Sequence, residues 1–144
     1  MIENIKVMLH FGYPCVEEKK RARIKQILSS RLDSGNIKVL KKEIEEMFPE
    51  AMERMRKLYG TNDPLTRAMD YWLKGGHNKV LEYEVHHEES RNFCEGYKAK
   101  IINHGNNVYQ VEYGGKKELV FDELLSNLKI GSEVWIHRGY AVYQ

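Results

Sequence analysis

The sequence predicts an α+β protein in which a small N-terminal helical bundle is followed by a C-terminal five-stranded β-barrel. Two observations lead to this fold class. Apolar residues recur every three or four positions in the first half of the chain, whereas short strand-like runs separated by turn residues fill the second half. A chain of 144 residues suffices for one ordinary domain or two small ones. We place the helical domain at residues 1–90 and the barrel domain at residues 91–144, with the charged run HHEESRN at the boundary.

The first half carries apolar stripes with helical spacing. They predict four helices, over residues 16–35, 36–48, 50–60 and 64–76. Glycine or proline is expected to bound them, at Gly35, Pro49, Gly60 and Gly75-Gly76. The opening run IKVMLHFGYP and the run at residues 78–92 have no decisive period, and each is compatible with a strand or a helix.

The second half carries five short runs of strand-forming residues. In chain order they are KAKIINH, VYQVEY, KKELVF, EVWIH and YAVYQ. Gly114-Gly115 between the second and third runs is a hairpin signal. The polar run DELLSNL at residues 122–128 has room for one helical turn. Five short strands at this spacing predict a small closed or partly open barrel of the OB-like type.

Composition disfavours several classes of protein. No apolar run approaches the roughly 18 residues of a membrane span, and the N-terminus lacks the features of a secretory signal, so we expect a cytoplasmic protein. Residues 94–144 hold six basic and six acidic side chains, a balance of 6 − 6 = 0, which disfavours a nucleic-acid-binding barrel. Phosphate-binding and nucleophile motifs are absent from the sequence, so we expect no enzymatic activity.

Between Cys94 and Val142 the residues follow a more specific pattern. The segment opens with Cys94-Glu-Gly-Tyr-Lys-Ala-Lys100 and ends with His137-Arg-Gly-Tyr-Ala-Val142. This pattern resembles the HypC/HupF hydrogenase-assembly chaperones, which begin Met-Cys, place a lysine at the same spacing and end in a Val-His-x-Gly-Phe-Ala-Ile strand pair. Further matching positions are Gly114, Gly115, Leu124, Leu125, Gly131, Val134, Gly139, Tyr140 and Ala141. Lys98-Ala99 stands where that family has Pro-Gly.

The resemblance implies a function for two of these residues. The family's functional cysteine and histidine fall on Cys94 and His137. A thiolate is a soft donor suited to iron, and a neutral imidazole is a good second ligand. Because two ligands cannot close a metal shell, the resemblance implies transient iron binding together with a HypD-like partner. The iron would then pass to the large-subunit precursor of a nickel–iron hydrogenase.

Two other functions stay open. The barrel could serve as a protein–protein interaction or regulatory module without metal chemistry, or, less favoured, as a nucleic-acid-binding barrel. Other metal-type side chains occur at Cys15, at His77 and in the run His86-His87-Glu88-Glu89. Adjacent residues on a helix or strand point in different directions, so that run is a poor chelate by itself. We interpret it as a solvated linker and His77 as a loop residue.

Overall fold

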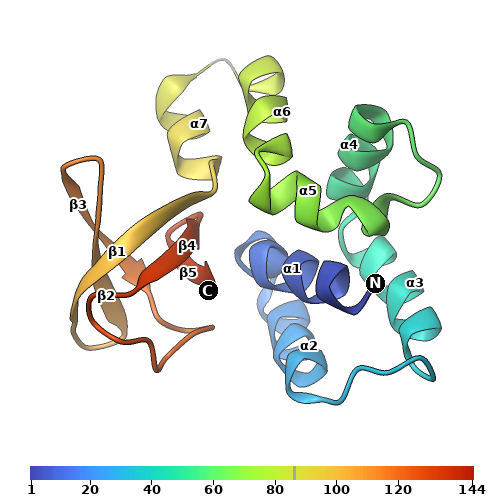
Figure 1. Ribbon diagram of the computed structural model, residues 1–144, viewed down its shortest axis with the longest axis horizontal. Helices are drawn as coiled ribbons and strands as arrows, with labels where there is room; N and C mark the ends of the chain where they lie inside the picture. Colours follow the sequence, from blue (N-terminus) through green and yellow to red (C-terminus); the bar gives the residue numbers. More distant parts are fainter. Residues whose placement is uncertain (86) are drawn as a thin grey trace. The chain divides into compact units, whose positions relative to one another are not determined.

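The computed structural model describes residues 1–85 and 87–144, which form two compact units, Met1–Glu84 and Val85–Gln144 (Figure 1). The first unit contains α1 (Ile2–Gly12), η1 (Tyr13–Cys15), α2 (Glu18–Ser29), α3 (Ile37–Met47), α4 (Pro49–Tyr59), η2 (Pro64–Arg67), α5 (Ala68–Leu73) and α6 (Gly76–Glu84). The second contains α7 (Glu88–Cys94), β1 (Tyr97–His104), β2 (Val108–Tyr113), β3 (Lys116–Phe121), β4 (Glu133–His137) and β5 (Tyr140–Tyr143). The protein is therefore α+β with a β-barrel. The boundary expected between residues 90 and 91 stays a prediction, and α7 spans it.

α1 lies at the centre of the first unit. It contacts α2, α3, α5 and η2, and the ring of its Phe11 stacks on Trp72 at a centroid distance of 5.1 Å. Its fully buried side chains are Ile5, Val7, Met8, Leu9 and Phe11. The three consecutive residues Val7, Met8 and Leu9 are all buried, so the short apolar run shows no clear helical period. This is why the opening run was compatible with either a strand or a helix.

The four stripes with helical spacing form α2, α3, α4 and the pair η2–α5. One predicted end was wrong: α2 stops at Ser29 rather than near Gly35. The hydroxyls of Ser29 and Ser30 donate to the carbonyls of Gln26 and Ile27, at 3.0 and 2.6 Å. Such local side-chain bonds compete with helical ones, and Ser30 is already extended.

The run at residues 78–92 is helical at residues 78–84 and 88–92 and contains no strand among its described residues. α6 contains its first part, and α7 begins at Glu88 after the extended residue His87. None of the helices in the described ranges combines the length and apolar character of a membrane span. The expected cytoplasmic location stays a prediction.

All five strand-like runs of the second half form strands. They close a barrel in the order β1-β2-β3-β5-β4, with β4 pairing back onto β1. The β3–β5 pair is parallel, and the other pairs are antiparallel. Gly114 and Gly115 join β2 to β3 with φ of 55° and 79°, as a two-residue hairpin turn requires.

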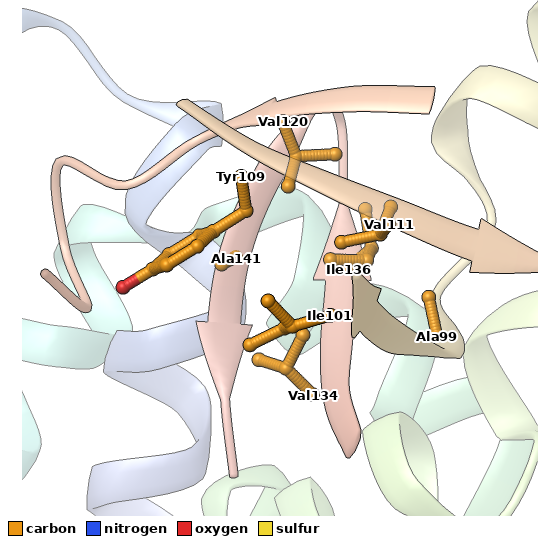
Figure 2. Packing of buried hydrophobic residues seen from close by; sticks show 8 residues of the cluster. All are labelled: Ala99, Ile101, Tyr109, Val111, Val120, Val134, Ile136 and Ala141. Atoms are coloured by element: carbon orange, nitrogen blue, oxygen red, sulfur yellow. The ribbon is translucent and has the colours of Figure 1, made fainter. Parts of the chain in front are cut away.

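Alternate residues of the strands fill the barrel interior (Figure 2). The cluster consists of Ala99, Ile101, Tyr109, Val111, Val120, Val134, Ile136 and Ala141. It also packs against Leu125 and Leu128 from the segment between β3 and β4. The barrel thus has a side-chain core of its own.

Tyr109 fixes the long connection between β3 and β4. Its ring is fully buried, and its hydroxyl donates to the Leu125 carbonyl at 2.6 Å and accepts from the Leu128 N–H at 3.1 Å. Residues 122–128 form bends and irregular backbone, so the helical turn that DELLSNL could have made is not present there. The Leu125 carbonyl and the Leu128 N–H therefore bind the Tyr109 hydroxyl instead of each other.

We expect Tyr109→Phe to lower the free energy of unfolding of the barrel by about 1 kcal/mol. The substitution keeps the ring in the core but leaves the Leu125 carbonyl and the Leu128 N–H without their partner. Native-state hydrogen exchange of the barrel amides measures this free energy without interference from the helical unit. Tyr113→Phe, at a half-exposed ring, is the matched control and should change little. Equal effects of the two substitutions would contradict the role assigned to the Tyr109 hydroxyl.

Candidate functional site

Cys94 and His137 belong to the same end of the barrel. Cys94 is the last residue of α7, which leads directly into β1, and His137 is the last residue of β4 (Figure 1). The antiparallel β1–β4 register pairs Tyr97 with Ile136. Cys94 therefore lies three residues before this pair and His137 one residue after it. Because antiparallel strands start and finish at opposite ends, both residues lie where β1 begins and β4 finishes.

Arg138 connects the two regions. It follows His137 directly, and its Nη2 atom donates to Cys94 Sγ at 3.4 Å. The same guanidinium lies 5.9 Å from the centre of the Phe93 ring, the neighbour of Cys94 on α7. The end of α7 is thus held against the β4–β5 hairpin by a contact to the sulfur and a contact to the adjacent ring.

The backbone of Arg138 is unusual for its residue type. Arg138 and Gly139 join β4 to β5 as a two-residue turn, and their φ angles are 50° and 81°. Turns of this kind favour Asn-Gly, because most side chains clash in the left-handed region. The backbone conformation of Arg138 is unfavourable for an arginine, whereas its side chain contacts Cys94 and Phe93. Residues held in a backbone conformation that is unfavourable for their type concentrate at functional sites.

Cys94 and His137 differ in their access to solvent. Cys94 is partly exposed. His137 is only 1% exposed, although Val134 and Ile136 are the residues of β4 that fill the barrel interior. Strand alternation therefore places the His137 side chain on the outer face of β4, and it is buried there. A ligand approaching this end of the barrel meets the sulfur before the imidazole.

The described residues provide no closed metal site at this end of the barrel. Across residues 1–85 and 87–144, no three side chains of His, Cys, Asp or Glu come together as a metal-binding group. Cys94 and His137 supply two donors at most, and a metal bound there needs further ligands from elsewhere. The partner that the sequence leads us to expect stays a prediction.

Tyr97 lies in the β1–β4 pairing that closes the barrel, next to this region. Its hydroxyl donates to the Glu118 carboxylate on β3, and its ring lies 4.8 Å from that of Tyr113. Burial is the main cause that raises the pKa of Tyr97, and the hydrogen bond and negative charge of Glu118 raise it further. The phenol therefore stays protonated over the physiological range.

None of the other metal-type side chains forms a metal-binding group in the described chain. Cys15 is exposed in the first unit. His77 is not a loop residue as predicted: it lies in α6, is buried, and its Nδ1 is 3.1 Å from the Tyr71 hydroxyl. In the run His86–Glu89, His86 lies outside the described residues, and the other three are exposed.

Sequence reasoning missed Arg138 and Phe93. Phe93 is 57% exposed, although aromatic side chains more often lie inside a protein, and its position beside Cys94 became visible only once α7 was placed. Arg138 had a detectable signal. An arginine immediately before a glycine, between two short strand-like runs, occupies a turn position that ordinarily carries Asn or Gly.

Comparison of the chain with protein-family models, with curated proteins and with solved structures found no match.

We expect Arg138→Asn to raise the free energy of unfolding of the barrel by about 0.5 kcal/mol. Asparagine tolerates the left-handed backbone, and this gain exceeds the loss of the contacts to Phe93 and Cys94. Urea denaturation of the wild type, of Arg138→Asn and of the control variant Arg138→Lys measures the difference. Arg138→Lys keeps the backbone strain and should show no gain. A less stable Arg138→Asn variant would mean that the side-chain contacts outweigh the strain.

Proposed function

We propose that this protein is an assembly factor of the HypC type, which holds a transition metal transiently together with a partner protein. One observation carries the proposal. Cys94 is a partly exposed thiol at the barrel end where β4 finishes at His137, and the next residue, Arg138, donates to its sulfur at 3.4 Å. Cys94 is the metal ligand and His137 its helper, as the HypC resemblance implies. Iron is the proposed cargo.

The barrel supports the OB-like part of this proposal. Small OB-like barrels have five strands in a Greek-key arrangement. The observed order β1-β2-β3-β5-β4, with its parallel β3–β5 pair, is compatible with that class. We therefore assign the barrel to the OB-like class on its topology and on the residues that it has in common with HypC.

The chemistry follows from the exposure of each residue. A thiolate is a soft ligand that can meet an incoming metal at the surface. His137 is 1% exposed, so in this proposal its imidazole joins only after the side chains covering it move aside. The remaining ligands come from the partner, for which the HypC resemblance names a HypD-like protein. A hydrogenase large-subunit precursor would be the recipient.

One observation favours a second function. His137 is buried and no third metal-type side chain accompanies it among the described residues, as expected for a histidine kept for structure alone. In that case the barrel is a protein–protein interaction module, and Phe93 and Arg138 contribute to its binding surface. The two functions differ in whether Cys94 binds metal.

A titration with Co²⁺ under anaerobic conditions tests the metal site. Cobalt replaces iron as a spectroscopic probe, and its bond to a thiolate produces a charge-transfer absorption. We expect this absorption in the wild type and its loss in Cys94→Ser, because the sulfur is the proposed first ligand. Water can fill the positions that the partner would occupy.

Cys15→Ser is the matched control, since it removes the exposed cysteine of the other unit and should leave the absorption unchanged. Absorption that survives in Cys94→Ser, or that depends on Cys15 instead, would overturn the metal proposal. The interaction module without metal chemistry would then be the better account.

A further inference from the structure

The sulfur of Cys94 has a positive charge beside it. Arg138 Nη2 donates to Cys94 Sγ at 3.4 Å, across 44 positions of the chain. The guanidinium carbon of Arg138 also lies 5.9 Å from the centre of the Phe93 ring, so two contacts hold the cation at the end of α7. A guanidinium keeps its charge at every physiological pH. The proposed metal ligand therefore lies in the field of a permanent cation.

The acidic residue next to Cys94 has an arginine of its own. Arg91 Nε lies 4.0 Å from the Oε1 atom of Glu95, four residues further along the chain. Arg91 therefore offsets the negative charge of Glu95, whereas Arg138 adds positive charge at the sulfur. The HypC pattern Val-His-x-Gly leaves position 138 open, so the resemblance assigns no role to this guanidinium.

A divalent metal that binds Cys94 makes the sulfur site more positive. A thiol that exchanges its proton for the metal changes from neutral to singly positive, and a thiolate changes from singly negative to singly positive. Like charges repel, so the Arg138 guanidinium opposes either change. A hydrogen bond to a ligand atom also tunes how strongly that atom binds its metal. Both effects of Arg138 weaken the bond between sulfur and metal.

We propose that Arg138 regulates the site by weakening the bond between Cys94 and a divalent metal, so that the chain alone releases its metal readily. A partner that adds an anionic ligand supplies the negative charge that offsets the guanidinium, and the complex then retains the metal. Arg138 contacts the ligand atom and not the metal, so it is a positioning residue. The inference deepens the proposed function and rests on it for the metal and the partner.

A purely structural role for Arg138 has the opposite consequence. If the side chain only fastens the end of α7 to the β4–β5 turn, its removal leaves Cys94 less ordered, and the metal binds more weakly. If the charge acts on the sulfur as proposed, its removal makes the metal bind more tightly. The direction of the change in affinity therefore separates the two roles.

The test is a Co²⁺ titration of full-length Arg138→Met in the Cys15→Ser background, which leaves Cys94 as the single cysteine. We expect the thiolate charge-transfer absorption to saturate at about tenfold lower Co²⁺ than with Arg138 present. The absorption should also move to lower energy, because the guanidinium no longer stabilises the sulfur electrons. Arg138→Lys keeps the positive charge and should behave as Arg138 does. Methionine and lysine meet the same left-handed backbone, so charge is what distinguishes these variants.

Two further variants are controls for folding and for net charge. Arg138→Asn is a second neutral variant, which the left-handed backbone accepts, and it should bind Co²⁺ as tightly as Arg138→Met. Lys129→Met removes a positive charge at an exposed residue before β4 begins and should leave the affinity unchanged. Neutral variants at position 138 that bind Co²⁺ with unchanged or lower affinity would overturn the inference.

Alkylation of Cys94 supplies a readout that needs no metal. In the Cys15→Ser background, mass spectrometry compares the rates of reaction with iodoacetate, which is anionic, and with iodoacetamide, which is neutral. A guanidinium beside the sulfur attracts the anionic reagent, so the ratio of the two rates should fall about threefold in Arg138→Met. An unchanged ratio means that the cation does not act at the sulfur, and the inference then fails.

The outcomes separate this inference from the metal proposal. If Cys94-dependent absorption occurs with Arg138 present but neutral variants bind Co²⁺ no more tightly, the proposed function stands and the inference fails. Absorption that develops only in the neutral variants, and that Cys94→Ser abolishes, supports the inference. If no variant shows such absorption, both proposals fail whatever the alkylation result.

Discussion

The pairing of β1 with β4 is the contact on which the second unit depends. It comprises the pairs Tyr97↔Ile136, Lys98↔Trp135, Ala99↔Val134 and Lys100↔Glu133. The pairing converts a curved sheet into a barrel, and it also sets the location of the candidate site. Cys94 and His137 are separated by 137 − 94 = 43 positions in the chain. They belong to one end of the barrel because the strands beside them run in opposite directions.

The barrel could be predicted from the sequence because each of its strands has local signals. Alternating apolar residues mark the strands, and paired turn residues such as Gly114-Gly115 mark the connections. The closing pairs could not be predicted in this way, since they join segments far apart in the chain. The central helix α1 could not be distinguished from a strand, because its buried apolar residues Val7, Met8 and Leu9 occupy consecutive positions and show no clear period. The end of α2 depended on two serine hydroxyls whose hydrogen bonds a periodicity pattern does not contain.

Some features of the candidate site could likewise be predicted from the sequence, and others could not. Cys94 and His137 could be selected from the sequence because the HypC resemblance marks their positions. The burial of His137 could not, since strand alternation alone places it on the outer face of β4. Arg138 became significant only when its backbone and its contact with Cys94 were seen together. Its left-handed conformation is unfavourable by itself, so the contacts of its side chain account for its presence better than the turn does.

The single β3–β5 pair has a consequence for how the barrel moves. Within the described residues these two strands form a single partner pair, Phe121↔Tyr140, beside which the Phe121 N–H donates to the Gly139 carbonyl and the rings of Phe121 and Tyr140 lie 5.1 Å apart. Each of the other junctions is held by several pairs. The β3–β5 junction therefore has the fewest pairs of the five junctions of the barrel, and we expect local unfolding to begin there. If β3 and β5 separate, the β1–β4 pairing remains intact. The residues around Cys94 would then stay together while β3 and β5 move apart.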